Sequence, residues 1–169
     1  QLTVNPRTAH EYLQLSEGNR KITNDASNPN YNRGFETFLS YAQTLCTEAL
    51  QERCYWEVEW EGQQVYIAMS YIELLRMYCS DTVSFGFNDK SWSLRCNSSQ
   101  FAFFHDSYKK VISGPLSRRI GIYLDHRART LSFYSITDTM KLLHRVGTLF
   151  TEPLYGGFWV FDDSSVKLC

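Results

Sequence analysis

The stretch that most constrains the fold is RCYWEVEW at residues 53–60, because its residue types alternate with a period of two. Alternation places Trp56, Val58 and Trp60 on one face of an extended segment and polar or charged side chains on the other. Two tryptophans and a valine at this spacing favour an antiparallel strand with one packed side and one wet side. Runs at 120–125 and 130–134, separated by a polar turn, have the same character. The sequence therefore predicts sheets that pack face to face.

Further short apolar runs follow at similar spacing, and no long helical period separates them. The pair Glu61-Gly62 is typical of a tight turn into residues 65–71, so the runs on either side of it are expected to form a hairpin. Strands are also expected at 91–96, 100–104, 142–150, 158–161 and 166–168. The pattern favours an all-β fold, a two-layer antiparallel β-sandwich with one or two short helical turns, over an α/β fold.

Size and charge narrow the function classes. A chain of 169 residues is one domain in size and can bury a substantial core. Because 17 Lys plus Arg stand against 18 Asp plus Glu, no global field attracts nucleic acid or an anionic membrane. No segment approaches the ~20 apolar residues of a membrane span, so no transmembrane segment is expected. The five cysteines are odd in number and irregularly spaced, which indicates reduced thiols rather than a zinc site.

These runs and their motifs, in this order, resemble the PRY-SPRY domain of tripartite-motif ubiquitin ligases, butyrophilins and fish innate-immune receptors. The PRY part is carried by residues 2–6, 8–10, 13–17 and Arg20, and the SPRY part by 55–60, 85–86, 91–94, 124–125, 130–134 and 150–155. The match covers the chain and predicts a single domain over 1–169, with a PRY portion at 1–45 and a SPRY portion at 46–169. Phrases at 66–71, 88–94 and 142–146 are similar to fish members, including fish NOD-like receptors and stonustoxin-type venom subunits.

The resemblance implies a concanavalin-like jelly roll with no catalytic residue, no cofactor and no metal, whose loops bind a partner that is usually a protein. We therefore expect a non-catalytic target-recognition module, the C-terminal domain of a tripartite-motif-like or other innate-immune protein, which would be cytoplasmic. The alternative is a standalone or secreted lectin-like defence protein, or the C-terminal domain of a stonustoxin-like pore-forming subunit. That alternative predicts secretion.

The loops expected to bind the partner cover 23–33, 72–84, 97–99, 108–117 and 138–145. The candidate partner-binding residues in or beside them are Asn28, Asn30, Tyr31, Glu73, Leu74, Arg76, Tyr78, Arg95, Asn97, Ser98, Lys141 and Arg145. Residues 71–78 are unusually apolar for such a loop. Either Ile72 and Leu75 fold back as a lid over the core, or side chains such as Leu74 and Tyr78 stay exposed as an anchor patch.

Two other ligand chemistries deserve a comparison with protein recognition. Glu57, Glu59 and Glu61 share one strand face, as the spaced carboxylates of concanavalin-like glycosidases do, but no cleft or sugar-stacking aromatic accompanies them. We interpret these carboxylates as structural. Basic residues at 118–119, 126–127, 141 and 144–145 could form an anion pocket for a phosphorylated ligand, although such scattered charges are more typical of a solvated surface. Carbohydrate, phosphorylated small ligands and nucleic acid are therefore weaker alternatives to a protein target.

Two departures from the family pattern carry structural expectations. The family's Ala-Gly-Thr turn is Ala128-Arg129-Thr130 here, and a positive φ at Arg129 would cost on the order of 1 kcal/mol. We expect that turn to be reshaped. The family's Tyr-Pro-Gly-Phe is YGGF at residues 155–158, so the loss of proline is expected to loosen that corner.

Overall fold

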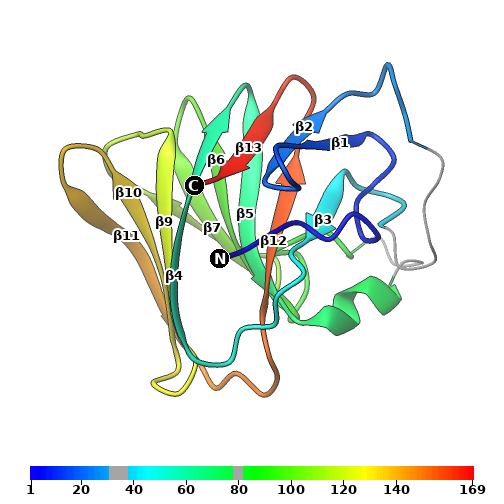
Figure 1. Cartoon of the computed structure of the whole chain (residues 1–169). Helices are drawn as coiled ribbons and strands as arrows, with labels where there is room; N and C mark the ends of the chain where they lie inside the picture. The colour runs from blue at the N-terminus through cyan, green and yellow to red at the C-terminus, as the bar shows by residue number, and fades with distance from the viewer. Residues whose placement is uncertain (31–37, 78–81) are drawn as a thin grey trace.

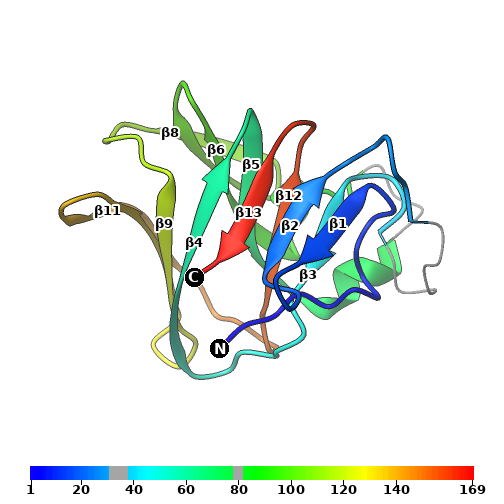
Figure 2. The ribbon, with the colours of Figure 1, turned by 45° about the horizontal axis from the view of Figure 1, so that its top comes forward.

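Two antiparallel β-sheets stack face to face in the computed structural model, which describes residues 1–30, 38–77 and 82–169 (Figure 1). The seven-stranded sheet has the order β1-β2-β13-β4-β9-β10-β11, and the six-stranded sheet has the order β3-β12-β5-β6-β7-β8. Figure 2 shows β1, β2, β13, β4 and β9 side by side in one layer, with β5, β6 and β12 behind them. The predicted two-layer β-sandwich is confirmed.

The elements have the following bounds. The seven-stranded sheet contains β1 (Leu13–Ser16), β2 (Lys21–Asn24), β4 (Arg53–Glu61), β9 (Arg119–Asp125), β10 (Thr130–Ile136), β11 (Met140–Gly147) and β13 (Ser165–Leu168). The six-stranded sheet contains β3 (Gln43–Leu45), β5 (Gln64–Ser70), β6 (Ser91–Asn97), β7 (Phe101–His105), β8 (Tyr108–Ile112) and β12 (Tyr155–Val160), and a 3-10 helix, η1 (Ile72–Met77), follows β5.

The alternation in β4 sets the inner side of its sheet. Trp56, Val58 and Trp60 are buried in the core between the layers, while Glu59 on the other side of the strand is exposed. Removing an apolar side chain of this size from water contributes about 1.5–3 kcal/mol. Trp92 of β6 meets them from the facing sheet and is also buried, as its sequence context predicts.

The predicted hairpin between β4 and β5 is wrong. β4 pairs with β13 and β9, whereas β5 pairs with β12 and β6, so the short connection carries the chain from one layer to the other. Gly62 makes this crossing with a φ of +97°, and a Cβ there would lie 2.0 Å from the carbonyl oxygen of Asp163. Short connections look alike in sequence whether their strands pair or separate, because pairing partners are chosen at long range.

Two expected loops are edge strands. Residues 108–117 contain β8, residues 138–145 overlap β11, and the strand predicted at 142–150 ends at Gly147. Each strand closes one sheet at its end and is exposed along much of its length. Most residues of β8 and β11 are exposed or half-buried, so these segments lack the apolar–polar alternation that marks a strand with one packed face.

The turn at Arg129 keeps a left-handed residue rather than being reshaped, since Arg129 has a φ of +62°. The amide of Thr148 donates to the carbonyl of Arg129 (3.0 Å), which ties this turn to the segment after β11. The expected loose corner at residues 155–158 is also wrong: Gly156 and Gly157 are buried residues of β12. A Cβ at Gly157 would lie 2.7 Å from the ring of Phe85, so this glycine is a packing site.

Within the described residues, Cys46, Cys54, Cys96 and Cys169 are free thiols, and Cys96 is fully buried. Cys79 lies outside the described residues. None of the described helices combines the length and hydropathy needed to cross a membrane.

Candidate functional site

The outer side of the six-stranded sheet carries a cross-strand row of large side chains. Strand register aligns Trp159 of β12 with Tyr66 of β5 and Tyr66 with Arg95 of β6, and the row ends at the small Ala102 of β7. Directly opposed side chains on one face have Cβ atoms about 4.5–5.5 Å apart. The row therefore forms a continuous strip on the surface that faces away from the core.

Five aromatic rings gather on this strip, and we call them the aromatic face: Tyr66, Phe87, Phe104, Trp159 and Phe161. Tyr66 stacks on Trp159 with a centroid separation of 4.5 Å, and Phe161 lies 4.8 Å from Trp159. Phe104 lies 5.6 Å from Tyr66 and 5.0 Å from Phe87. Tyr66 and Phe104 are buried, while the other three rings are half-buried and accessible.

A neighbouring row of small residues explains why the rest of this surface is covered. Gly157, Ala68 and Ser93 are in register on β12, β5 and β6, and the buried ring of Phe85 lies against Gly157. Leu74 of η1 is fully buried in the same cluster. Figure 1 and Figure 2 show η1 beside β3, at one end of the sheet. Phe85 and η1 cover the row of small residues. The neighbouring row of large side chains lies beside this cover and belongs to the aromatic face.

Arg95 is the charged group of the aromatic face. Its guanidinium carbon lies 5.4 Å from the centroid of the Phe104 ring, and burial raises the pKa of Tyr66 while Arg95 opposes that rise. Among the described residues, the buried Nε of Arg95 and Oγ of Ser93 have no hydrogen-bond partner. An unsatisfied buried polar group costs about 1–3 kcal/mol, and few occur in folded proteins. Because both atoms are buried, a partner meets the half-buried remainder of Arg95 and the rings around it rather than these two atoms.

A pocket of about 250 Å³ opens at the β12 end of the aromatic face. Its lining residues include Tyr12, Tyr41, Trp159 and Phe161, together with His10 and Asp162. This volume is below the roughly 300–1,000 Å³ of small-molecule sites, so the pocket suits one side chain of a larger partner.

The structure brings three predicted site residues to this surface or its rim. Arg95 lies in the row itself, and Asn97, two residues on, donates through Nδ2 to Oε1 of Gln64 (3.1 Å). Ser98 is exposed in the turn that follows β6. These positions stay candidates for partner contact.

The η1 candidates differ in exposure. Arg76 is exposed, and Glu73 forms an ion pair with Lys90 (3.5 Å). Leu74 is fully buried, so its place among the partner contacts is corrected: its side chain is part of the cover over the sheet. Of the two residues expected to form a lid, Leu75 packs half-buried against this cluster, whereas Ile72 is 37% exposed and Leu74 folds inward in its place.

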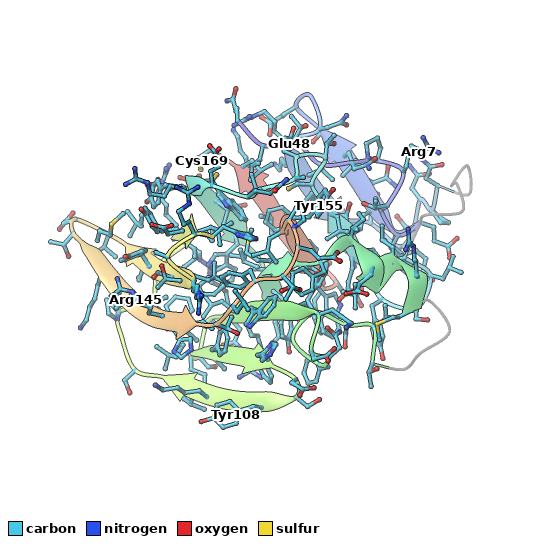
Figure 3. The ribbon with its side chains drawn as sticks, turned by 90° about the horizontal axis from the view of Figure 1, so that it is seen from below. Arg7, Glu48, Tyr108, Arg145, Tyr155 and Cys169 are labelled. Carbon is cyan, nitrogen blue, oxygen red and sulfur yellow. The ribbon has the colours of Figure 1, made fainter. Side chains whose placement is uncertain are left out.

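The remaining candidates do not join the aromatic face. Asn28 and Asn30 are exposed after β2, where the amide of Asn30 donates to the carbonyl of Glu11 (2.8 Å). Lys141 and Arg145 lie on β11 of the other sheet, and Figure 3 shows Arg145 well separated from Tyr155 of β12. Tyr31 and Tyr78 lie outside the described residues.

The carboxylates of β4 form a surface network with Arg119. The guanidinium of Arg119 contacts Glu57 (2.7 Å) and Glu59, and the hydroxyl of Tyr55 donates to Glu57. The Tyr55 hydrogen bond, followed by that of Arg119, lowers the pKa of Glu57. A glycosidase acid needs a raised pKa, so this carboxylate is tuned in the opposite direction.

The basic residues considered for an anion pocket are spread over separate contacts. Arg118 lies over the Trp60 ring (4.2 Å), His126 contacts the carbonyl of Glu152 (2.8 Å), and Arg145 donates through Nε to Ser132 Oγ (3.1 Å). Their side chains bind different parts of the protein surface and do not converge.

Sequence reasoning missed the aromatic rings of this site. A usable signal was present in the FW pair at 158–159, because adjacent strand residues face opposite sides and Phe158 alone suffices for the core. Tyr66, flanked by buried Val65 and Ile67, carried the same signal. A large aromatic side chain at a strand position that alternates with the buried ones indicates a second packed or binding surface.

Comparison with known proteins gives consistent relatives. The family described as "SPRY-associated domain" (PRY) matches residues 2–50, and the SPRY domain matches residues 53–169. Stonustoxin subunit beta of Synanceia horrida is 35% identical over 167 residues, which cover 96% of this chain and 23% of that protein. Tripartite motif-containing protein 16 of Mus musculus is 34% identical over 163 residues, 94% of this chain and 29% of that protein. The chain thus spans about a quarter of the length of these relatives.

Solved structures agree with the sheet topology. The stonustoxin structure matches all of this chain and 28% of its own chain, with a TM-score of 0.91 and 30% identity. The crystal structure of the TRIM65 PSpry domain matches 99% of this chain and 89% of its own, with a TM-score of 0.90 and 25% identity. From its sequence matches and its fold, the chain belongs to the PRY-SPRY family.

Proposed function

We propose that this domain recognises a protein partner through the aromatic face and performs no reaction there. The observation that carries the proposal is the cluster of half-buried rings on one sheet surface, with the guanidinium of Arg95 over one ring of the cluster. Aromatic and arginine side chains are enriched at the centre of protein interfaces, where they supply most of the binding free energy. A protein partner can cover the half-buried rings and the half-buried Arg95 side chain at the same time.

The chemistry available to the domain supports binding rather than turnover. The carboxylates of β4 lie on the outer side of the other sheet and are held by Arg119, with the pKa of Glu57 lowered. The proposal therefore requires no cofactor and no metal. A carbohydrate or phosphorylated ligand is less well supported, because the basic residues do not converge, and the near-zero net charge argues against nucleic acid.

Two settings fit the relatives. E3 ubiquitin-protein ligase TRIM65 of Mus musculus is 28% identical over 172 residues, which supports a target-recognition module of a larger cytoplasmic tripartite-motif-like or innate-immune protein. Similarity to both stonustoxin subunits supports the alternative, a domain of a secreted toxin-like or defence protein. In either setting, the division into 1–45 and 46–169 stays a prediction.

Affinity capture with matched variants tests the proposal. The wild-type domain, Arg95→Met and Phe161→Ala would be immobilised, and proteins captured from tissue of the source organism would be quantified by mass spectrometry. Arg145→Met, on the opposite sheet, is the control. We expect at least one protein to be retained by wild type and Arg145→Met but lost from both aromatic-face variants. Equal capture by all four folded proteins would refute recognition through this face.

A further inference from the structure

We propose that the pocket beside the aromatic face binds an arginine side chain of the protein partner. This inference rests on the proposed function and names the chemical group that the site selects. The residues that line the pocket include four aromatic ones, Tyr12, Tyr41, Trp159 and Phe161, and the acidic Asp162. Aromatic faces attract cations through the ring quadrupole, and a carboxylate adds a charge-assisted hydrogen bond.

The lining of the pocket, as far as the structure describes it, contains the acidic Asp162 and a buried histidine, His10, but no Lys or Arg. Asp162 is exposed and forms no ion pair with any residue in the described ranges 1–30, 38–77 and 82–169. Arg95 lies at the other end of the aromatic face, over Phe104 rather than over Trp159. A cationic side chain that enters the pocket would meet an available carboxylate at the rim. An acidic side chain would be repelled.

Arginine already occupies aromatic surfaces twice in the described structure. Arg118 lies 4.2 Å from the Trp60 ring, and Arg95 lies 5.4 Å from the Phe104 ring. In the described part of the chain, no guanidinium lies over Trp159 or Phe161. A planar guanidinium stacks on a ring while it donates two parallel hydrogen bonds to a carboxylate, which lysine cannot do. This geometry favours arginine over lysine.

Backbone and side-chain contacts within the domain hold the β12 side of the pocket. Asn24 donates through Nδ2 to the carbonyl of Val160 (2.8 Å), and the amide of Val160 donates to the carbonyl of Ala42 (3.0 Å). Tyr41 meets Trp159 edge-on at 5.2 Å. A preformed pocket of this kind avoids part of the ordering cost of binding.

Peptide titration followed by NMR tests the assignment. The probes are acetyl-Gly-Arg-Gly-amide, the same tripeptide with citrulline, a neutral analogue of arginine, and the same tripeptide with lysine. We expect the arginine peptide to shift the indole resonance of Trp159 and to bind about tenfold more tightly than the citrulline peptide. Equal affinity for arginine and citrulline, or shifts confined to other residues, would overturn the pocket. Equal affinity for lysine would overturn the choice of arginine.

A matched pair of variants separates the pocket from general surface charge. Asp162→Asn should weaken arginine-peptide binding several-fold. Asp163→Asn should leave it unchanged, since asparagine tolerates the φ of +58° at that residue. If Asp162→Asn binds like wild type, the pocket assignment fails. Recognition through the aromatic face would still stand if Arg95→Met alone abolishes partner capture, so the two proposals fail separately.

Discussion

The outer surfaces of the two sheets each present an arginine to solvent, but they treat it differently. On the seven-stranded sheet, Arg119 contacts Glu57 and Glu59, and the hydroxyl of Tyr55 completes the network. On the six-stranded sheet, Arg95 lies over Phe104 with its Nε unsatisfied within the described residues. On the first surface, the arginine is paired with carboxylates of the domain itself. The second surface leaves three aromatic rings of the aromatic face half-buried beside Arg95, which is why we assign recognition to it.

The largest loss of stability should come from Gly157→Ala in the six-stranded sheet. Gly121→Ala is the comparable change in the seven-stranded sheet. Gly157 lies against the buried ring of Phe85, and Gly121 lies against the hydroxyl end of Tyr55, which is 40% exposed. Gly157→Ala should destabilise the domain by about 2 kcal/mol, because Phe85 has no space to move. Gly121→Ala should cost less than about 1 kcal/mol, because Tyr55 can swing outward. Urea denaturation measures both, and equal losses would show that the two surfaces are packed alike.

Replacing the two arginines by methionine should separate stability from binding. Arg119→Met should lower the free energy of unfolding by about 1 kcal/mol or less, since its ion pairs are partly screened by solvent. Arg95→Met removes an unsatisfied buried group and should be neutral or slightly stabilising. Partner capture should show the opposite order, with Arg95→Met affected and Arg119→Met unchanged. Loss of stability in Arg95→Met together with retained capture would contradict the assignment.

The seven-stranded sheet has its own local strain in the β9–β10 turn. Arg129→Gly should stabilise the domain by about 0.5–1 kcal/mol, because glycine adopts the φ of +62° without a steric cost. Arg127→Gly, whose φ is not positive, is the matched control and should give no such gain. Thermal unfolding of both variants provides the measurement. A gain of the same size in Arg127→Gly would point to lost charge rather than relieved strain.

The smallest effect is a pH dependence where the edges of the two sheets meet. Burial, followed by the charge of Lys110, lowers the pKa of His144 from its usual 6.5, and its ring lies 4.1 Å from Phe103. The unfolded chain therefore binds the proton more readily than the folded domain. Stability should fall by a few tenths of a kcal/mol as the pH drops below about 6.5. His144→Gln should remove this component from a pH series of unfolding curves, and an unchanged pH profile would contradict it.

The core and the layers were predictable because they follow from local alternation. Trp56, Val58 and Trp60 alternate cleanly, and their strand and its buried side are as expected. The partner of that strand was not predictable, because pairing to β13 joins residues about a hundred positions apart, such as Glu61 and Ser165. The sequence around β4 does not indicate which distant strand pairs with it.

The candidate site was predicted only at Arg95 and its neighbours Asn97 and Ser98, and their role stays a prediction. Lys141 and Arg145 were grouped with them because both segments look like loops, but the register of β11 carries them to the other sheet. The rings of Trp159 and Tyr66 were assigned to strands and not to a surface. That the outer face of a sheet also carries a packed cluster can be recognised only once the neighbours of each strand are known.

The two last strands have a consequence for how the chain is made. β12 lies between β3 and β5, and β13 lies between β2 and β4, so both layers wait for residues 155–168. While the ribosome is still extending the chain, β4 and β5 each expose an unpaired edge next to large apolar side chains. Nascent protein in that state is open to misassembly, and both layers can close together once residues 155–168 have left the ribosome.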